Sequence, residues 1–375
     1  MQYAEKVVFA GDHMQLAPLI KSKTAAKLGL SDTLFDQVIR HSPKLVRMLK
    51  IQHRMNENIM FWSSECMYKG ELVAAPSVAD QLLGDSANYK VPKGKEMNTL
   101  EFEDQRCFLS ESLFCIDTSS CNLYESEISD SFSKYNIGEA GLVKLTVNKL
   151  KRLGMKDDDI GVITPYRAQV NIIRKFLTDD EKWSKRSYCD VSTVDGFQGR
   201  EKEVIIISMV RSNDNYSVGF LSDERRLNVA ITRAMKLCII IGDSYVVRKT
   251  RKEDKKNMWK VDQCTFYDNH NNFLTNMYRY FKRFGEWRNA IDYFSPSGSD
   301  SPSINYNRRR RYSDSSQSSF SSHHDHFEGG FNAGYHAENG GDQPRPEIDR
   351  SKYEISKSSD IGKNTYKRYK SFQNI

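Results

Sequence analysis

The chain has 375 residues, of which 38% are hydrophobic and 28% are charged, and its formal net charge is +7. This length predicts about two to three domains, and the low apolar share indicates that part of the chain stays unfolded. No run of about 18 apolar residues occurs, which argues against a membrane-spanning helix. The seven cysteines include no CxxC pair, so we expect reduced core thiols in a cytoplasmic or nuclear protein without a bound metal.

Short apolar runs alternate with helical patterns along the chain. The predicted strands are Val7–Ala10, Ile160–Thr164, Asp190–Val194, Val204–Met209 and Leu237–Gly242. The predicted helices are Gly138–Leu153, Arg167–Leu177 and Arg225–Ala234. Because the run "VIIISMV" is apolar on both faces, it is typical of a strand covered by helices on two sides. The alternation predicts an α/β fold with a doubly wound parallel sheet.

The remaining segments differ in composition. Residues 84–137 are polar and predict a long irregular excursion, whereas Phe273–Tyr293 has helical spacing and should close the fold. Residues 295–375 are rich in Ser, Gly, Arg and His and predict a disordered tail. The arginine run Arg308–Arg311 would contact phosphates or direct nuclear import, or it is simply a solvated charge run. The clustered histidines of the tail lack the spacing of a metal site.

Two polar segments near the start of the chain suggest chemistry. In "GDHMQLAP", Gly11 allows a sharp turn, and the Gln15 side chain can both donate and accept hydrogen bonds. The alternative is a plain turn with Asp12 as a cap. Arg54 precedes a helix-like run, and a fixed guanidinium beside a nucleotide would stabilise charge on a transferring phosphoryl group. The alternative is an ordinary surface arginine.

Two further segments follow predicted strands. In "IGVITPYRAQV", Thr164 and Tyr166 end a strand and could hold a phosphate and stack a base, or Pro165 simply opens a helix. In "STVDGFQGREKE", glycines allow a ligand to approach the backbone closely. There Thr193 could reach a phosphate and Glu201 could accept hydrogen bonds from a ribose.

The segment "DERRLNVAITRAMK" carries two arginines seven residues apart. Arg226 and Arg233 would lie on one face of a helix, and Thr232 would cap or orient that helix. For Arg226 we favour a structural salt bridge over a catalytic role.

These blocks, in this order, resemble the superfamily 1 helicases, in the branch of the up-frameshift RNA helicase. The resemblance covers residues 1 to about 294 and is carried by "GDHMQLAP", "MYKGELVAAPSVA", "VDGFQGREKEVIIISMVRSN", "VGFLSDERRLNVAITRA" and "FLTNMYRYFKRFGEWRNAIDY". It implies ATP-driven 5′-to-3′ movement along single-stranded RNA or DNA, with ATP and Mg²⁺ held between two RecA-like domains. Residues 1–50 would be the edge of the first domain, 51–294 the second, and 295–375 the tail, which could bind ribonucleoprotein partners.

The resemblance also assigns roles to particular residues. Gln15 would couple the γ-phosphate to nucleic acid, Arg54 and Arg233 would be arginine fingers, and Glu201 would hold the ribose. Thr164, Tyr166 and Thr193 would face the nucleic-acid strand. The chain has "QHRM" where the family usually has "QYRM", so His53 would replace the tyrosine that packs on adenine.

The family's phosphate loop, G-x-x-x-x-G-K-[ST], and its D-E-x-x-Q segment do not occur in the sequence. Because these elements bind phosphate and Mg²⁺, we expect this chain alone to be inactive as an ATPase. We therefore expect the C-terminal part of a helicase. The alternative is a stand-alone protein that binds nucleic acid or a partner without catalysis. We also expect residues 1 to about 25 to be poorly anchored, with the folded unit beginning near Ile51.

Overall fold

The computed structural model describes residues 5–18, 20–92, 99–128, 131–178, 189–246 and 273–293. The statements about disorder, arginines and histidines in the tail 295–375 fall outside these residues. Within the described ranges, no helix is long and apolar enough to cross a membrane.

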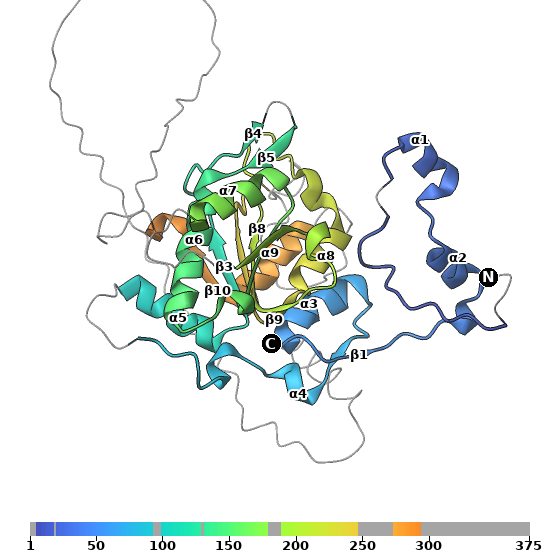
Figure 1. The fold of residues 1–375 in the computed structure, drawn as a ribbon, viewed down its shortest axis with the longest axis horizontal. Coiled ribbons are helices and arrows are strands. Elements are labelled where there is room, and N and C mark those ends of the chain that lie inside the picture. Colours follow the sequence, from blue (N-terminus) through green and yellow to red (C-terminus); the bar gives the residue numbers. More distant parts are fainter. Residues whose placement is uncertain are drawn as a thin grey trace, which may run out of the picture. The chain divides into compact units, whose positions relative to one another are not determined.

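A six-stranded parallel sheet lies at the centre of the fold, in the order β10-β3-β9-β8-β6-β7 (Figure 1). The strands are β3 Leu113–Asp117, β6 Ile160–Thr164, β7 Asp190–Thr193, β8 Lys202–Ser208, β9 Ala234–Gly242 and β10 Glu286–Asn289. All four strands predicted between residues 160 and 242 are present, and the predicted parallel α/β sheet is confirmed.

Helices cover both faces of this sheet, because alternate side chains of each strand enter two separate cores. Ile205 and Ile207 of β8 belong to one core, and Ile206 belongs to the other. The first core is covered by α3 Glu57–Met67, α8 Glu224–Ile231 and α9 Phe273–Phe284. The second is covered by α5 Thr99–Ser110, α6 Ile137–Arg152 and α7 Arg167–Thr178 (Figure 1). This layering makes the fold doubly wound.

Small elements complete the described chain. The short helices are α1 Lys23–Ala25, α2 Leu34–His41 and α4 Pro76–Ala79, together with a π-helical turn Ala26–Leu30 and 3₁₀ turns Pro43–Leu45, Leu83–Asp85, Asp157–Asp159, Asp195–Phe197, Gly219–Ser222 and Ala290–Tyr293. Strands β1 Ile51–Gln52 and β2 Val73–Ala74 form a parallel pair, and β4 Ser126–Ile128 and β5 Ser133–Tyr135 form a hairpin.

The prediction of an irregular excursion over residues 84–137 is wrong. This segment contains α5, the β4–β5 hairpin and β3, a fully buried strand between β10 and β9. The apolar run of β3 is only four residues long and is flanked by polar residues, so its local pattern does not predict a strand. Its burial comes from neighbours that are distant in sequence.

The prediction of one helix over Phe273–Tyr293 is also wrong in its second half. The helix α9 ends at Phe284, and Glu286–Asn289 form the edge strand β10. Gly285 makes the change of direction possible, because a Cβ there would lie 2.5 Å from the Leu113 carbonyl oxygen. The helical spacing of apolar residues therefore extends beyond Phe284, where the helix itself ends.

The predicted strand Val7–Ala10 is absent. These residues are irregular, and Val8 is 92% exposed. A strand needs a partner for its backbone groups, and none pairs with this segment in the described part of the chain. None of the described residues from 5 to 50 is buried. The loop that follows Gly11 nevertheless contacts the domain, because the Tyr68 hydroxyl donates to Asp12.

Candidate functional site

Two arginines from distant parts of the sequence lie side by side. Arg54 follows β1, and its Nε pairs with a carboxylate oxygen of Glu201, which lies between β7 and β8. Arg54 Nη1 also donates to the Thr232 carbonyl oxygen at 3.2 Å. Arg233 directly follows Thr232, so both guanidinium groups are fixed by the end of α8.

The Arg233 guanidinium is held in a nearly dry environment. It is only 3% exposed, and its Nε donates to the Val229 carbonyl oxygen at 3.0 Å. Burial, and then the neighbouring positive charge of Arg54, lower the pKa of Arg233 to about 10, whereas Glu201 raises it. Two adjacent guanidinium groups that disfavour each other's charge are stabilised by an anion between them. Glu201 already supplies one negative charge to the pair, and the Arg233 nitrogens donate to the Val229 and Arg200 carbonyl oxygens and to the Thr232 hydroxyl, so a phosphate group would have to share or displace these contacts.

The Gln15 side chain belongs to a compact loop built around Asp12. The Asp12 carboxylate accepts hydrogen bonds from Gln15 Nε2 at 2.8 Å, from the Met14 amide at 2.9 Å and from the Tyr68 hydroxyl at 2.7 Å. Tyr68 caps the C-terminus of α3. The loop is thus attached to the domain that carries the two arginines.

A continuous hydrogen-bond chain joins this loop to Arg233. Asn228 Nδ2 donates to the Tyr68 hydroxyl at 3.0 Å and to the Met14 carbonyl oxygen at 2.9 Å. The Thr232 hydroxyl donates to the Asn228 carbonyl oxygen at 2.7 Å, and Arg233 Nη2 donates to that hydroxyl at 3.2 Å. The loop is therefore connected to Arg233 through three side chains, those of Tyr68, Asn228 and Thr232.

The carboxyl ends of β6 and β7 form a second polar surface. Thr164 and Thr193 end these neighbouring strands in direct register. The Thr164 hydroxyl is buried and has no hydrogen-bond partner within the described ranges, whereas Thr193 is half-buried and accepts from the Gly196 amide at 3.3 Å. Ligands of open parallel sheets bind beyond the carboxyl ends of the strands. This edge is therefore a candidate ligand-binding surface.

Comparison with known proteins now decides the family. A family model described as an AAA domain matches residues 30–245. The rat DNA-binding protein SMUBP-2 is 39% identical over 291 residues, which are 77% of this chain and 25% of that protein. The budding yeast DNA polymerase alpha-associated DNA helicase A is 39% identical over 250 residues, 65% of this chain and 35% of that protein. A Neurospora crassa homologue of regulator of nonsense transcripts 1 is 39% identical over 249 residues, which are 65% of this chain and 21% of that protein.

This chain belongs to the superfamily 1 helicases, in the up-frameshift-like branch. The resemblance inferred from the five sequence blocks is thereby confirmed. The chain spans about a fifth to a third of the length of these three relatives.

The sequence pattern does not single out two residues of the hydrogen-bond chain, Tyr68 and Asn228. Burial, followed by the hydrogen bond to Asp12, raises the pKa of the Tyr68 hydroxyl, which therefore stays protonated and donates. Asn228 lies in α8, four residues and about one helical turn before the capping residue Thr232. This spacing is the sequence signal for a contact between Asn228 and Thr232. For Tyr68, nothing in the local sequence indicates a contact with a loop 56 residues earlier.

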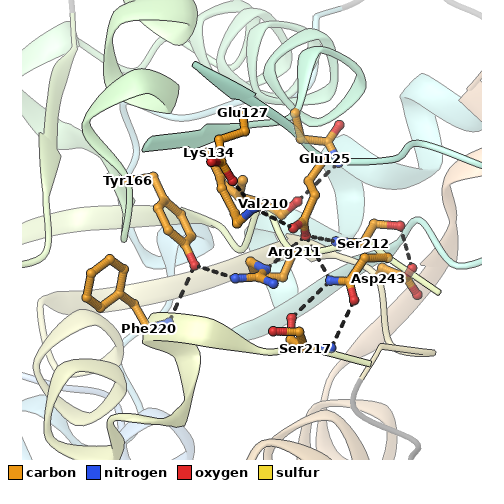
Figure 2. A network of polar contacts seen from close by, with 12 residues as sticks. Glu125, Glu127, Lys134, Tyr166, Val210, Arg211, Ser212, Ser217, Phe220 and Asp243 are labelled. Atoms are coloured by element: carbon orange, nitrogen blue, oxygen red, sulfur yellow. Dashed lines mark hydrogen bonds and ion pairs between the residues drawn. The ribbon is translucent and has the colours of Figure 1, made fainter. Parts of the chain in front are cut away.

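The structure corrects the expectation that the Tyr166 ring stacks a base. Tyr166 is only 4% exposed, and its hydroxyl accepts from Arg211 Nη1 at 3.0 Å and from the Phe220 amide at 3.4 Å (Figure 2). A buried ring offers no face to a base in this conformation. His53, by contrast, is exposed in the bend beside Arg54, and its contact with adenine stays a prediction.

The helix that was expected to carry both Arg226 and Arg233 is shorter than predicted. It ends at Ile231, so Arg233 lies just beyond it. Arg226 pairs with Asp195 at 3.5 Å and with Asp223 at 3.6 Å. The preferred interpretation of Arg226 as a salt-bridge residue agrees with these contacts.

A buried ion pair holds together the segments at the carboxyl edge. Arg211 Nε donates to Glu125 Oε2 at 2.8 Å, and the same oxygen accepts from the Ser212 amide and from Asn213 Nδ2, each at 3.0 Å (Figure 2). Arg211 is 5% exposed, and removing one partner of such a pair costs about 3–5 kcal/mol. The loop after β8 is therefore fixed to the segment before β4.

No group of three or more His, Cys, Asp or Glu side chains suited to a metal occurs among the residues that the structure describes.

Proposed function

We propose that this chain supplies the second RecA-like half of an ATP-dependent 5′-to-3′ helicase that acts on single-stranded RNA or DNA. Residues 51–294 would form that half, and residues 1–50 would belong to the edge of the first RecA-like domain. Arg54 and Arg233 would stabilise the transferring phosphoryl group, and Gln15 would report its presence.

The observation that carries this proposal is the convergence of Arg54 and Arg233 beside the Gln15 loop. The pKa of Arg233 is lowered first by burial and then by Arg54, and Glu201 only partly offsets this, so a further negative charge beside the pair would be favourable. A bound triphosphate would supply such a charge. When bound, ATP and its Mg²⁺ supply the transferable phosphoryl group and its counter-charge. The chain's own residues would orient and neutralise it.

The remaining contacts of the nucleotide would come from the edge of the same site. Glu201 would accept from the ribose, which requires its pairing with Arg54 to open or to be shared. His53 would lie against the adenine, because it is exposed directly before Arg54. The hydrogen-bond chain through Tyr68 would transmit changes at Gln15 to Arg233.

The nucleic-acid strand would cross the carboxyl ends of β6 and β7, near Thr164, Tyr166 and Thr193. In this proposal Thr193 contacts the strand directly, and Tyr166 supports the surface from below. The alternative function, a stand-alone binding protein without catalysis, would use the same edge but not the arginine pair.

A binding measurement tests the nucleic-acid half of the proposal. The purified chain should bind a fluorescein-labelled 15-nucleotide single strand, RNA or DNA, more tightly than the corresponding duplex in fluorescence anisotropy without ATP. Replacing Thr193 by valine should weaken this binding, because the hydroxyl is lost while the size is kept. The same change at Thr178, an exposed threonine at the end of α7, should have no effect. Absence of binding, or equal affinity for the duplex, would refute the proposal.

A further inference from the structure

We infer that Phe220 is the side chain that stacks on an unpaired base at the carboxyl edge of the sheet. This inference rests on the proposed binding of single-stranded nucleic acid and adds the residue that contacts the bases. The ligand class is an unpaired nucleobase in RNA or DNA, without a preference for sequence.

Phe220 is exposed, whereas the aromatic ring packed beside it is buried. It is 53% exposed, in a 3₁₀ turn of the loop that follows β8, whereas the adjacent Tyr166 is 4% exposed. The two ring centroids are 5.4 Å apart with an interplanar angle of 55°. The guanidinium carbon of Arg226 lies 5.1 Å from the Phe220 ring centroid. The ring is thus held between an aromatic and a cationic neighbour while part of it stays open to solvent.

The backbone around Phe220 is fixed by the buried network of Figure 2. The Phe220 amide donates to the Tyr166 hydroxyl, which also accepts from Arg211. Gly219 has φ +54°, and a Cβ there would lie 2.2 Å from Arg211 Nη1 and 2.6 Å from the Tyr166 hydroxyl oxygen. Only glycine fits this close approach. A ring on so constrained a turn loses little conformational entropy when a ligand binds.

The ring contacts residues that are linked to both of the strand ends proposed for nucleic acid. Tyr166 follows β6 by two residues, and Arg226 pairs with Asp195, which follows β7 by two residues. Phe220 therefore contacts residues tied to both strand ends. An exposed aromatic ring with a nearby guanidinium is the combination that binds single strands, since every base has a face that stacks on it.

If Phe220 stacks on a base, its replacement should weaken the binding of a strand that carries bases but not of a strand without them. Removing one aromatic platform weakens binding by roughly 5- to 150-fold. The Phe220→Leu chain should show a loss in this range for a normal 15-nucleotide single strand. Its affinity for an abasic strand of the same length should equal that of the wild type, because that strand keeps only sugars and phosphates. Phe102→Leu, at a 47% exposed phenylalanine on α5, should leave both affinities unchanged.

The other possible binding results each contradict a different part of the account. If the wild-type chain binds neither strand, both the proposed function and this inference fail. If the wild-type chain binds but Phe220→Leu has no effect, stacking by Phe220 is refuted while nucleic-acid binding stands. An equal loss on both strands would also refute stacking, because it would show that the substitution disturbs the phosphate contacts or the fold.

Discussion

Replacing Arg233 by alanine is expected to lower ATP turnover by about 10³–10⁵-fold in a motor that joins this chain to a phosphate-loop domain. The reason is that Arg233 is held by the end of α8, with its guanidinium next to that of Arg54, where a phosphoryl group would carry negative charge. Steady-state phosphate release in the presence of single-stranded RNA would measure the effect.

Two further variants separate catalysis from folding. Arg233→Lys keeps a positive charge but loses the planar fork, so it should still show a large loss in kcat while the chain stays folded. Arg152→Ala removes an arginine from α6, where it pairs with Glu101 on the opposite face of the sheet, and should leave turnover unchanged. Near-normal turnover by both Arg233 variants would contradict the assignment.

The free energy of unfolding is expected to fall as pH rises from about 5 to about 8, and Glu139 is the reason. Glu139 is fully buried on α6, and burial raises the pKa of its carboxyl group from 4.5 to about 8, with Asp243 and Glu125 adding to the rise. Its Oε2 accepts from the Ser208 hydroxyl at 2.7 Å and from the Val210 amide at 2.8 Å.

The sign follows from proton binding. Below about pH 4.5 both states carry the proton, and above about pH 8 neither does. Between these values the folded state binds more protons than the unfolded state, so stability falls by at most about 1.4 kcal/mol per pH unit. Glu139→Gln stays neutral and should flatten the profile, whereas Glu103→Gln, at an exposed carboxylate, should not. Parallel profiles for the wild type and Glu139→Gln, measured by urea unfolding, would refute this account.

The sequence predicted the strands best where burial on both faces made them apolar throughout. Ile160–Thr164 was predicted with its observed bounds, and β7, β8 and β9 within a few residues. The strands β3 and β10 were missed for different reasons. The run of β3 is short and follows a polar segment, and β10 continues the helical spacing of α9 until Gly285 turns the chain. The strand predicted over Val7–Ala10 is absent for the opposite reason, since an apolar pattern without partner strands does not form a sheet.

The candidate site was predictable in its residue types but not in its connections. The sequence singled out Arg54, Arg233 and Glu201 separately, and the structure brings them together. The sequence could not reveal that Tyr68 and Asn228 link the Gln15 loop to Arg233, because these contacts join residues that are far apart in sequence. It also could not distinguish the buried Tyr166 from an exposed ring, because burial at the carboxyl edge depends on the loop after β8.

The most direct test of the central claim is ATP turnover by this chain alone and by the same chain joined to a phosphate-loop RecA-like domain, both with single-stranded RNA. We predict no turnover by the chain alone, because it lacks the phosphate loop and the D-E-x-x-Q segment. We predict RNA-stimulated turnover by the joined motor. Turnover by the chain alone, or none by a correctly folded joined motor that binds RNA, would contradict the account.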